Sequence, residues 1–427
     1  PLAELAEYQE ILQRRRQKKG ILQIAGCVNS QKTHLMYALG EGFSYRVLVF
    51  SSEEKAQKAY EEYRFLDSEV CYYPARDLLF YHADLKGNYL MKQRMEVIRR
   101  LAEREKDQEI TVITTMDALL DGLSPMEEVL SGRISVRSGD TVDFTELQNQ
   151  LSNLGYVREV QIEGPGQFAV RGGILDVFPL TEEVPVRVEL WGDEVDSIRT
   201  FDVESQRSIE NLQEIEIYPA GELESSKKQS FLQYFPKEET LLLLDEPIRL
   251  AEQAKETEEE FQESIQKREE AGMEEEKELT VYAVSEILES MNQFYGIAFT
   301  ALEIKCKGLQ IQDTYYIQTK GVNPYNNSFE MLTRDLKRLK RNQYRVILLS
   351  GSRTRAKRLA EDLRDYDLSS FYSDDLKREV QPGEIMVAYG HVTQGYEYPM
   401  LKFMVISETD IFGRQKKKKR RKTYEGQ

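Results

Sequence analysis

The chain has few residues that could bind a transition metal. Its 427 residues include only three cysteines and three histidines, and none has the spacing of a zinc ligand set. We therefore expect no metal site. The cysteines, Cys27, Cys71 and Cys306, are odd in number and widely separated, which is typical of free thiols in a reducing cytoplasm.

The sequence also lacks long apolar runs and an excess of cations. No stretch is apolar over the roughly 18 residues that a membrane span needs, and no signal-peptide pattern opens the chain. The formal net charge of −16 opposes wrapping of DNA by bulk electrostatics, although it permits a local basic site. We expect a cytoplasmic protein without membrane contact, and, from the abrupt start at Pro1, a piece of a longer chain.

Apolar strands alternate with helices over the first 128 residues, which predicts right-handed crossovers and a parallel sheet. Ser51 is the expected N-cap of the helix after the second strand. The expected strands are Ile21–Ala25, Arg46–Phe50, Glu69–Tyr73 and Ile110–Thr114.

Residues 129–219 change to short strands with one helix, which predicts a β-rich insert of mixed or antiparallel pairing. The helix is expected to start at Asp143, with Glu146 in capping-box spacing, and to stop at Gly155. The expected strands are Gln167–Arg171, Ile174–Phe178, Val186–Trp191, Glu194–Phe201 and Glu214–Tyr218.

The α/β pattern then returns. Residues 220–314 contain a buried strand, Leu241–Leu244, and a Glu-rich solvated helix from Ile248 to Leu279. The polar stretch Gly321–Ser328 marks a further boundary, so that 315–412 is expected to form a small α/β domain and 413–427 a basic linker.

Residues 26–33 read Gly-Cys-Val-Asn-Ser-Gln-Lys-Thr, the Walker A pattern with Gln31 in place of its second glycine. A phosphate loop brings consecutive backbone N–H groups against an anion, and the long Gln31 side chain would crowd that approach. Lys32 and Thr33 are present, and Asp245 and Glu246 follow an apolar strand in the manner of a Walker B motif. One interpretation is binding of ATP and magnesium, and the other is a retained strand–loop–helix without nucleotide. Because of Gln31 we expect no catalytic residue, no cofactor and an inactive loop at Gly26, Gln31, Lys32, Thr33, Asp245 and Glu246.

Seven consecutive cationic residues lie near the end of the chain, Lys416, Lys417, Lys418, Lys419, Arg420, Arg421 and Lys422. They would suit contact with nucleic acid or an acidic partner, or they form a soluble linker. Charge alone does not decide between the two.

The insert carries a candidate docking surface. Alternation places Phe168 and Val170 on one face of a strand and Arg171 on the other, directly before a Gly-Gly turn. Arg158 is nearby in sequence and Trp191 lies at another turn, and both residue types are common in binding hot spots. The alternative is a solvated Arg171 in an ordinary hairpin, with Trp191 filling the domain edge.

Several segments together resemble the N-terminal part of the bacterial transcription-repair coupling factor family, and the resemblance covers essentially the whole chain. The segments are 26–33, Tyr72–Asp77, Phe168–Pro179, Phe201–Arg207, Ser407–Gly413 and the basic run with Lys422–Gln427.

The resemblance implies a fold similar to that of the excision-repair protein UvrB. The implied fold class is α/β, with a degenerate RecA-like, P-loop-like parallel-sheet domain (1–128 and 220–314) interrupted by a β-rich α+β insert (129–219). A second small α/β domain of unclear role (315–412) follows.

It also implies that the insert binds UvrA through Arg171, with Phe168 and Phe178 in the same block and Arg158 at a more variable spacing. The chain is then a non-catalytic, monomeric module of transcription-coupled nucleotide excision repair that recruits UvrA to lesions where RNA polymerase has stalled. Contacts with RNA polymerase and double-stranded DNA, and an ATP- and magnesium-dependent DNA translocase, would belong to the parent protein beyond Gln427.

Two departures from UvrB favour a docking module over a motor. Gln31 interrupts the phosphate loop, and Pro74–Asn88 is too short for the aromatic hairpin with which UvrB grips DNA. The alternative is a UvrB-like ATP-binding, DNA-remodelling helicase fragment, supported by Lys32-Thr33 and Asp245-Glu246. A third hypothesis is that the fragment restrains the motor of the parent, with its UvrA surface masked until activation.

Overall fold

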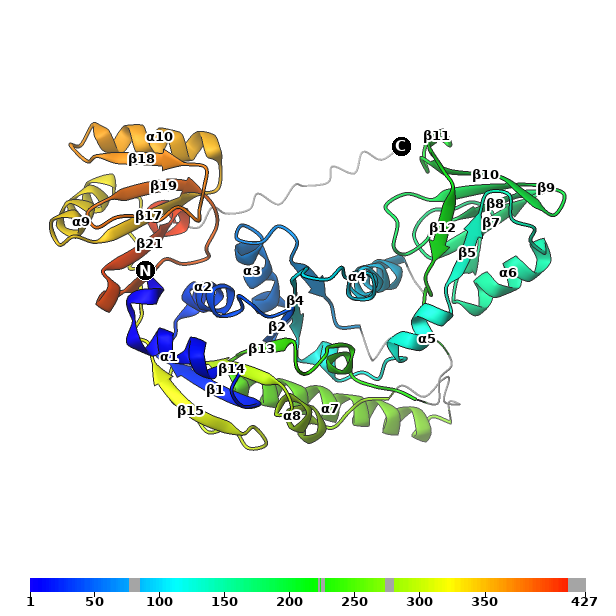
Figure 1. The fold of residues 1–427 in the computed structure, drawn as a ribbon, viewed down its shortest axis with the longest axis horizontal. Coiled ribbons are helices and arrows are strands. Elements are labelled where there is room, and N and C mark those ends of the chain that lie inside the picture. Colours follow the sequence, from blue (N-terminus) through cyan, green and yellow to red (C-terminus); the bar gives the residue numbers. More distant parts are fainter. Residues whose placement is uncertain (77–84, 222, 224–226, 273–279, 414–427) are drawn as a thin grey trace.

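The computed structural model describes residues 1–76, 85–221, 223, 227–272 and 280–413. A central sheet domain lies between the insert at one end of the molecule and the C-terminal domain at the other (Figure 1). The predicted basic run 416–422 and most of Pro74–Asn88 lie outside the described residues.

The central domain is built on seven parallel strands in the order β15-β1-β14-β13-β2-β4-β3. Strands β1, β2, β4 and β13 are buried along their whole length, as their continuous apolar sequences predict for a sheet covered on both faces. The strands are β1 (Gly20–Ala25), β2 (Tyr45–Phe50), β3 (Cys71–Tyr73), β4 (Ile110–Thr115), β13 (Thr240–Asp245), β14 (Tyr295–Phe299) and β15 (Ile311–Tyr316). The predicted parallel sheet is confirmed, and β15 crosses the expected boundary between 314 and 315.

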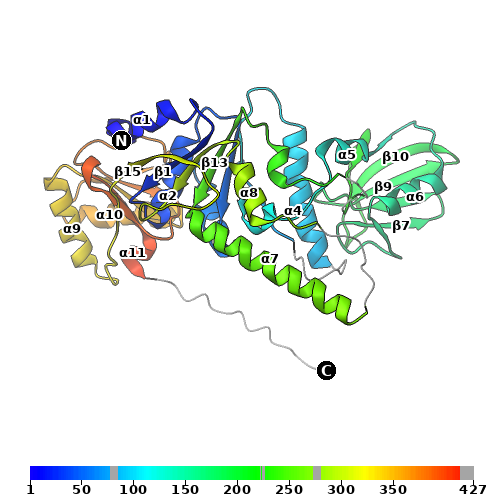
Figure 2. The same ribbon diagram turned by 90° about the horizontal axis from the view of Figure 1, so that it is seen from below.

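Helices cover both faces of this sheet. Three helices pack on one face of the sheet and share one hydrophobic core with it, namely α1 (Ala6–Arg14), α2 (Asn29–Leu39) and α3 (Glu53–Tyr63). Three others pack on the opposite face and share a second core, namely α4 (Leu85–Ala102), α7 (Pro247–Glu270) and α8 (Val284–Met291). Figure 2 shows α7 running along the outside of the domain.

Two expectations about these helices are corrected. The N-cap of α3 is Ser52, whose hydroxyl accepts the Lys55 N–H at 3.2 Å, and not Ser51, because one more residue of the chain stays extended before the helix begins. Helix α7 ends at Glu270, residues 271 and 272 form a turn, and the remainder of the predicted range, 273–279, lies outside the described residues.

The insert contains a six-stranded sheet in the order β11-β10-β9-β8-β7-β6 and a separate pair, β12 with β5. All neighbours are antiparallel except β6 and β7, so the predicted mixed pairing is confirmed. The strands are β5 (Ile134–Arg137), β6 (Val157–Arg158), β7 (Gln167–Arg171), β8 (Ile174–Val177), β9 (Val186–Trp191), β10 (Glu194–Phe201), β11 (Ser208–Leu212) and β12 (Glu214–Ile217).

The expected helix of the insert is α6 (Phe144–Asn153), and a shorter helix, α5 (Met126–Ser131), precedes the strands. The Asp143 carboxylate caps α6 by accepting the N–H groups of Thr145 and Glu146, both at 3.1 Å. Leu147 and Leu151 of α6 pack against Phe168, Leu175 and Val188 in one core. One face of the sheet is therefore covered.

The C-terminal domain is the predicted second α/β unit. Its mixed sheet has the order β16-β20-β21-β17-β19-β18. The strands are β16 (Lys320–Gly321), β17 (Arg345–Ser350), β18 (Ser370–Ser373), β19 (Ile385–Tyr389), β20 (Tyr396–Tyr398) and β21 (Phe403–Ser407), and the helices are α9 (Phe329–Arg341), α10 (Arg353–Arg364) and α11 (Glu408–Phe412).

This domain packs on α2 of the central domain. The half-buried His34 ring stacks on Tyr396 and Phe403, with centroids 5.9 and 6.2 Å away, and its Nδ1 lies 2.9 Å from the Tyr398 hydroxyl. Burial lowers the pKa of His34 to about 4, since the charged imidazolium loses its hydration. His34 is thus neutral when the C-terminal domain is packed on α2.

The His34 contact predicts a loss of stability in acid. A folded-state pKa near 4 lies below the unfolded value near 6.5, so the contribution of His34 is complete above about pH 6.5 and is lost as the pH falls toward 4. Between about pH 7.5 and pH 5, the wild type should lose about 2 kcal/mol more of its unfolding free energy than a His34→Asn variant, which does not titrate. Urea unfolding at both pH values measures this difference, and equal losses in the two proteins would contradict it.

Candidate functional site

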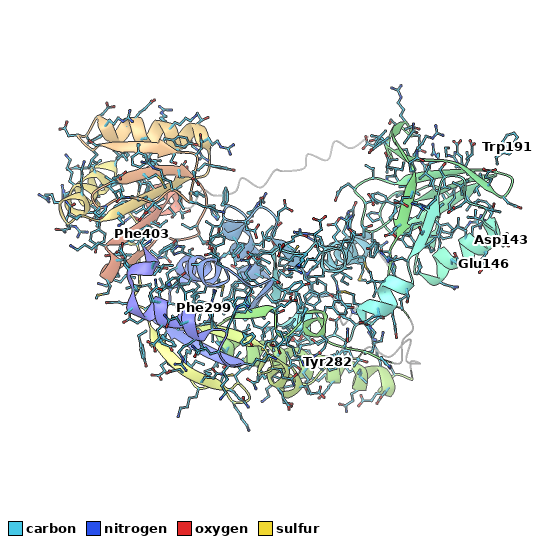
Figure 3. All side chains as sticks on the ribbon, viewed as in Figure 1. Asp143, Glu146, Trp191, Tyr282, Phe299 and Phe403 are labelled. Carbon is cyan, nitrogen blue, oxygen red and sulfur yellow. The ribbon has the colours of Figure 1, made fainter. Side chains whose placement is uncertain are left out.

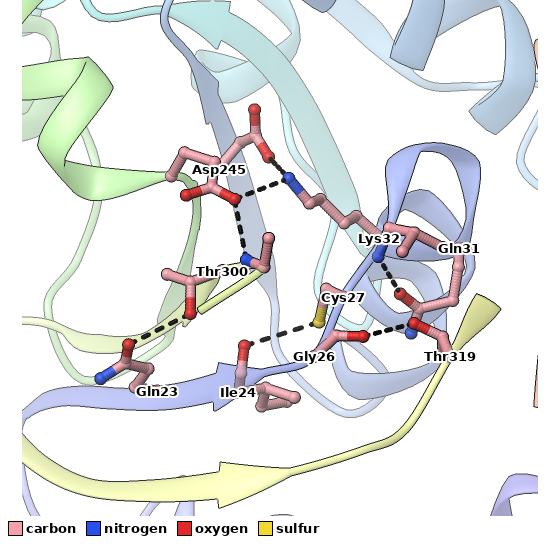
Figure 4. A network of polar contacts seen from close by, with 12 residues as sticks. Gln23, Ile24, Gly26, Cys27, Gln31, Lys32, Asp245, Thr300 and Thr319 are labelled. Carbon is pink, nitrogen blue, oxygen red and sulfur yellow. Dashed lines mark hydrogen bonds and ion pairs between the residues drawn. The ribbon is translucent and has the colours of Figure 1, made fainter. Parts of the chain in front are cut away.

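The degenerate nucleotide loop begins at Gly26, directly after β1. Gly26 has a φ of +89°, and a Cβ atom there would lie 2.7 Å from the carbonyl oxygen of Ile317. Its N–H donates to the Ala301 carbonyl at 3.1 Å, and its carbonyl accepts from the Thr319 hydroxyl (Figure 4). Gly26 packs closely against residues that precede and follow β15. This packing explains why a glycine is needed here, without a bound phosphate.

Gln31 fills the space behind the loop. Its side chain is fully buried, and Oε1 accepts the Val28 N–H at 3.1 Å (Figure 4). The Cys27 N–H donates to the Thr300 carbonyl at 3.0 Å. Helix α2 already begins at Asn29, so Gln31 lies in its first turn. The N–H groups of the first three loop residues, Gly26, Cys27 and Val28, are thus bound to protein groups here and not presented to an anion.

Lys32 forms a charge cluster with the two acidic residues at the end of β13. Its Nζ lies 2.9 Å from Oδ1 of Asp245 and 3.2 Å from Oε1 of Glu246 (Figure 4). Burial opposes the charged form of Lys32, but the two carboxylates outweigh it and raise its pKa. Glu246 Oε1 also accepts the Ala301 N–H at 2.9 Å. The two predicted parts of the nucleotide site, Lys32 in the loop and Asp245-Glu246 after β13, are therefore brought together as an ion cluster. Thr33 is buried nearby in α2.

The first turn of α2 also binds the C-terminal domain, a contact that sequence reasoning missed. The Ser30 hydroxyl donates to Glu62 Oε1 at 2.7 Å and accepts the Gln394 N–H at 3.2 Å. The same Glu62 oxygen accepts the Thr393 N–H at 2.8 Å, and Asn29 Nδ2 donates to Gln394 Oε1 at 2.6 Å. The loop between β19 and β20 thus lies directly on the helix that follows the nucleotide loop.

The predicted partner-binding residues of the insert separate into two groups. The Arg171 side chain is 63% exposed at the tip of the β7–β8 hairpin, and Arg158 is exposed on β6, where it donates to Gln148 Oε1 at 3.2 Å. Phe168 and Phe178 are buried, with 1% and 7% of their surfaces exposed. The two phenylalanines therefore support the strands from opposite cores and do not themselves offer a contact surface.

The positive charge of the Arg171 guanidinium is only weakly paired within the chain. The neighbouring carboxylate, Asp176, accepts two hydrogen bonds from Arg187, at 2.8 and 3.0 Å, through its two different oxygens. Arg171 reaches Asp176 only at 3.9 Å. An exposed guanidinium in this position remains available to a carboxylate of a partner.

Trp191 does not fill the domain edge, as one interpretation of the sequence expected. It is 84% exposed, and its indole points away from the body of the insert at the end of the molecule (Figure 3). That alternative is therefore wrong for Trp191.

Among the described residues, no group of three or more histidine, cysteine, aspartate or glutamate side chains could hold a metal ion. Within the same part of the chain, no helix has the length and apolar character required to cross a membrane.

Removal of the Lys32 cation should destabilise the central domain. A Lys32→Met variant leaves Asp245 and Glu246 side by side with little solvent, and we expect a loss of about 2 to 3 kcal/mol of unfolding free energy near pH 7.

Urea unfolding followed by circular dichroism measures this loss, with Lys32→Arg as the control that keeps the charge. A Lys32→Met protein as stable as the wild type would show that the cluster is not a structural contact.

Comparison with known proteins agrees with these observations. The UvrB interaction domain family matches residues 134–223, which contain the six-stranded sheet of the insert. Transcription-repair-coupling factors of Bacillus subtilis, Staphylococcus haemolyticus and Staphylococcus aureus are 26%, 26% and 27% identical over 93%, 83% and 84% of this chain. The chain spans only 35 to 39% of the length of these relatives. The chain is thus homologous to the N-terminal region of the transcription-repair coupling factors and contains a UvrB interaction domain.

Proposed function

We propose that this chain is a non-catalytic recruitment module that binds UvrA through its insert. The proposal is supported by the homology to transcription-repair coupling factors and by the family of the insert. In this role the chain contributes a docking surface, and it performs no chemistry of its own.

The observation that carries the proposal is the exposed and weakly paired guanidinium of Arg171. Arg171 directly precedes a two-residue glycine turn, its side chain is 63% exposed, and its neighbouring carboxylate, Asp176, is already bound by Arg187. Gly172 has a φ of +56°, and a Cβ on Gly173 would lie 3.0 Å from the Leu190 carbonyl oxygen, so both glycines are needed to form this tip. The backbone thus fixes the position of an exposed cation, which lowers the cost of ordering it on binding.

The wider role follows from the relatives and is part of the proposal. We infer that a full-length protein containing this chain recruits UvrA where RNA polymerase has stalled at a lesion and displaces the polymerase by ATP-dependent translocation on DNA. Displacement of the polymerase and translocation on DNA would use segments that the matched 35 to 39% of the relatives does not include, whereas recruitment of UvrA would use the insert. A second candidate, a UvrB-like ATPase, draws support only from the Lys32, Asp245 and Glu246 cluster, and the occupied donors around Gln31 weigh against it.

The proposal predicts a complex between this chain and UvrA. Purified fragment and UvrA should co-elute from a sizing column, and Arg171→Ala should weaken the complex by about 2 kcal/mol or more, because a carboxylate on the partner loses its counterion. Arg137→Ala is the matched control, since the Arg137 side chain is 66% exposed in the same insert but is paired with Glu214 at 2.8 Å on the β5–β12 sheet. Absence of a wild-type complex, or equal effects of both substitutions, would overturn the proposal.

The proposal also predicts that this chain does not bind ATP. Titration calorimetry of the fragment with ATP and magnesium should detect no binding, since Lys32 and the first backbone donors of the loop are already bound within the protein. Gln31→Gly should not restore binding, because α2 would still carry the 393–394 loop on its first turn. Micromolar binding by the wild type that Lys32→Ala abolishes would instead establish the ATPase alternative.

A further inference from the structure

The C-terminal domain concentrates positive charge in a chain whose formal net charge is −16. Residues 329–364 run from the start of α9 to the end of α10, and they contain eleven lysines and arginines but only four aspartates and glutamates. Most of the cationic side chains are exposed. A local surface of this sign attracts anions even when the whole protein is acidic.

The order of charges along α10 is the reverse of the order along α9. In α9 the charges follow the helix dipole, with an acid in the first turn and three cations in the last turn. In α10 no acid lies in the first turn, and the two acids, Glu361 and Asp362, lie in the second half. The cations of its first half are Arg353, Arg355, Lys357 and Arg358. Because cations at the positive end of the dipole destabilise a helix, the stability of α10 does not explain them.

The backbone at the start of α10 is already bound by groups of the domain itself. Glu408 Oε2 accepts the Gly351 N–H at 3.1 Å, and the Ser352 hydroxyl accepts the Arg355 N–H at 3.2 Å. The Arg355 guanidinium also lies 3.1 Å from Glu408 Oε1. Arg355 is thus neutralised within the domain, and the other three cations in the first half of the helix remain.

Two of these three cations are positioned by aromatic rings of the sheet beneath the helix. The guanidinium carbon of Arg353 lies 5.0 Å from the ring centroid of Tyr389, at the end of β19. The Nζ atom of Lys357 lies 5.3 Å from the ring centroid of Tyr372, on β18. A ring holds a cation in place but leaves its charge unneutralised. Cations positioned in this way lose less side-chain entropy when they bind a partner.

The acidic groups near the three cations do not neutralise them. Among the described residues, no carboxylate oxygen lies within 4.0 Å of their charged nitrogens. The Asp374 carboxylate accepts a hydrogen bond from the Tyr372 hydroxyl at 2.6 Å. Glu361 and Asp362 each follow a cation by four residues, which is the less favourable order for an ion pair along a helix. The three charges therefore remain available to an anion of a partner.

This surface also lacks the apolar centre of a protein interface. None of the exposed large hydrophobic side chains in the described part of the chain lies on α10, β18 or β19. Protein partners usually bury apolar and aromatic side chains at the centre of their contact. The phosphates of a nucleic acid are instead bound largely by exposed lysine and arginine side chains. The composition of the surface thus favours a nucleic acid over an acidic protein.

We propose that Arg353, Lys357 and Arg358 of α10 bind the phosphate backbone of a nucleic acid without reading its sequence. Helix α10 runs along the outer side of the C-terminal domain, at the end of the molecule opposite to the insert (Figure 1). A nucleic acid bound here would therefore not compete with a partner of the insert. The proposal does not depend on the binding of UvrA.

The salt dependence of binding tests this proposal. Fluorescence anisotropy measures the Kd for a labelled single strand of DNA and for the corresponding duplex between about 50 and 200 mM salt. In a triple variant, Arg353→Gln, Lys357→Gln and Arg358→Gln, the slope of log Kd against log salt concentration should fall by about 2 to 3. Each lost phosphate contact removes about 0.9 from that slope on a duplex and about 0.7 on a single strand.

A second triple variant is the matched control. Arg334→Gln, Arg338→Gln and Lys58→Gln remove three exposed cations, each paired with a carboxylate on its own helix. The control changes the net charge by the same amount, and it should reduce the slope by less than about 1, because paired cations release few counterions. Residues 416–422 are cationic in all three proteins, so their contribution cancels in the comparison.

Chemical modification locates the contact in the wild-type protein. Acetylation of lysines followed by mass spectrometry should show that DNA protects Lys357, whereas Lys58, paired with Glu54 on α3, reacts at the same rate with and without DNA. Circular dichroism of both triple variants checks that they are folded, as expected for glutamine at exposed helix positions.

Several results would overturn the proposal. They are absence of DNA binding by the wild type, equal slopes for the two triple variants, and acetylation of Lys357 that DNA does not slow. Polyglutamate that binds as tightly as DNA, with the same dependence on the three cations, would assign the surface to an acidic protein and also overturn it. None of these results bears on the complex with UvrA, so the two proposals fail separately.

Discussion

The architecture depends on the pairing of β13 with β2 and β14 in the middle of the central sheet. The chain leaves this sheet after β4 and returns to it as β13, with the whole insert between them. Lys32 joins the two segments at the end of β13 by binding Asp245 and Glu246. The insert is thus held at both of its ends by a buried parallel sheet, and its β7–β8 and β9–β10 hairpin tips are free to face a partner.

The residues of the predicted nucleotide loop form a joint with the C-terminal domain. Gln31 satisfies the Val28 N–H, Thr319 binds the Gly26 carbonyl, and Thr300 binds the Cys27 N–H. The first turn of α2 carries the loop of the C-terminal domain through Ser30 and Glu62. The first N–H groups of the loop and the Lys32 ammonium are therefore paired with protein groups, and the first turn of α2 lies at an interdomain contact. We regard this as the physical basis of the proposed loss of motor activity.

Much of the fold could be predicted from the sequence because its signals are local. Alternating apolar strands and helices predicted the central parallel sheet, and the Gly-Gly turn predicted the hairpin that presents Arg171. The partnership of Lys32 with Asp245 and Glu246 was also predictable, since both motifs follow strands whose carboxyl ends meet at one edge of a parallel sheet.

Other features depend on contacts between distant segments, which local patterns do not encode. The position of the 393–394 loop on α2 has no signal in either segment alone. The burial of Phe178 depends on a small second core with Phe201 and Ile162 on the open side of the insert sheet, so its place beside Arg171 in the sequence was misleading. The choice of Ser52 over Ser51 as the α3 cap depends on a single residue of extended chain.

The most direct test of the account is amide hydrogen exchange of the fragment alone, with UvrA, and with ATP and magnesium. The account predicts that UvrA slows exchange at residues 171–174 and 190–193, and that ATP changes nothing at residues 26–33 or 241–246. Protection of residues 26–33 by ATP, or protection by UvrA that is confined to parts of the chain other than these two hairpin tips, would contradict it.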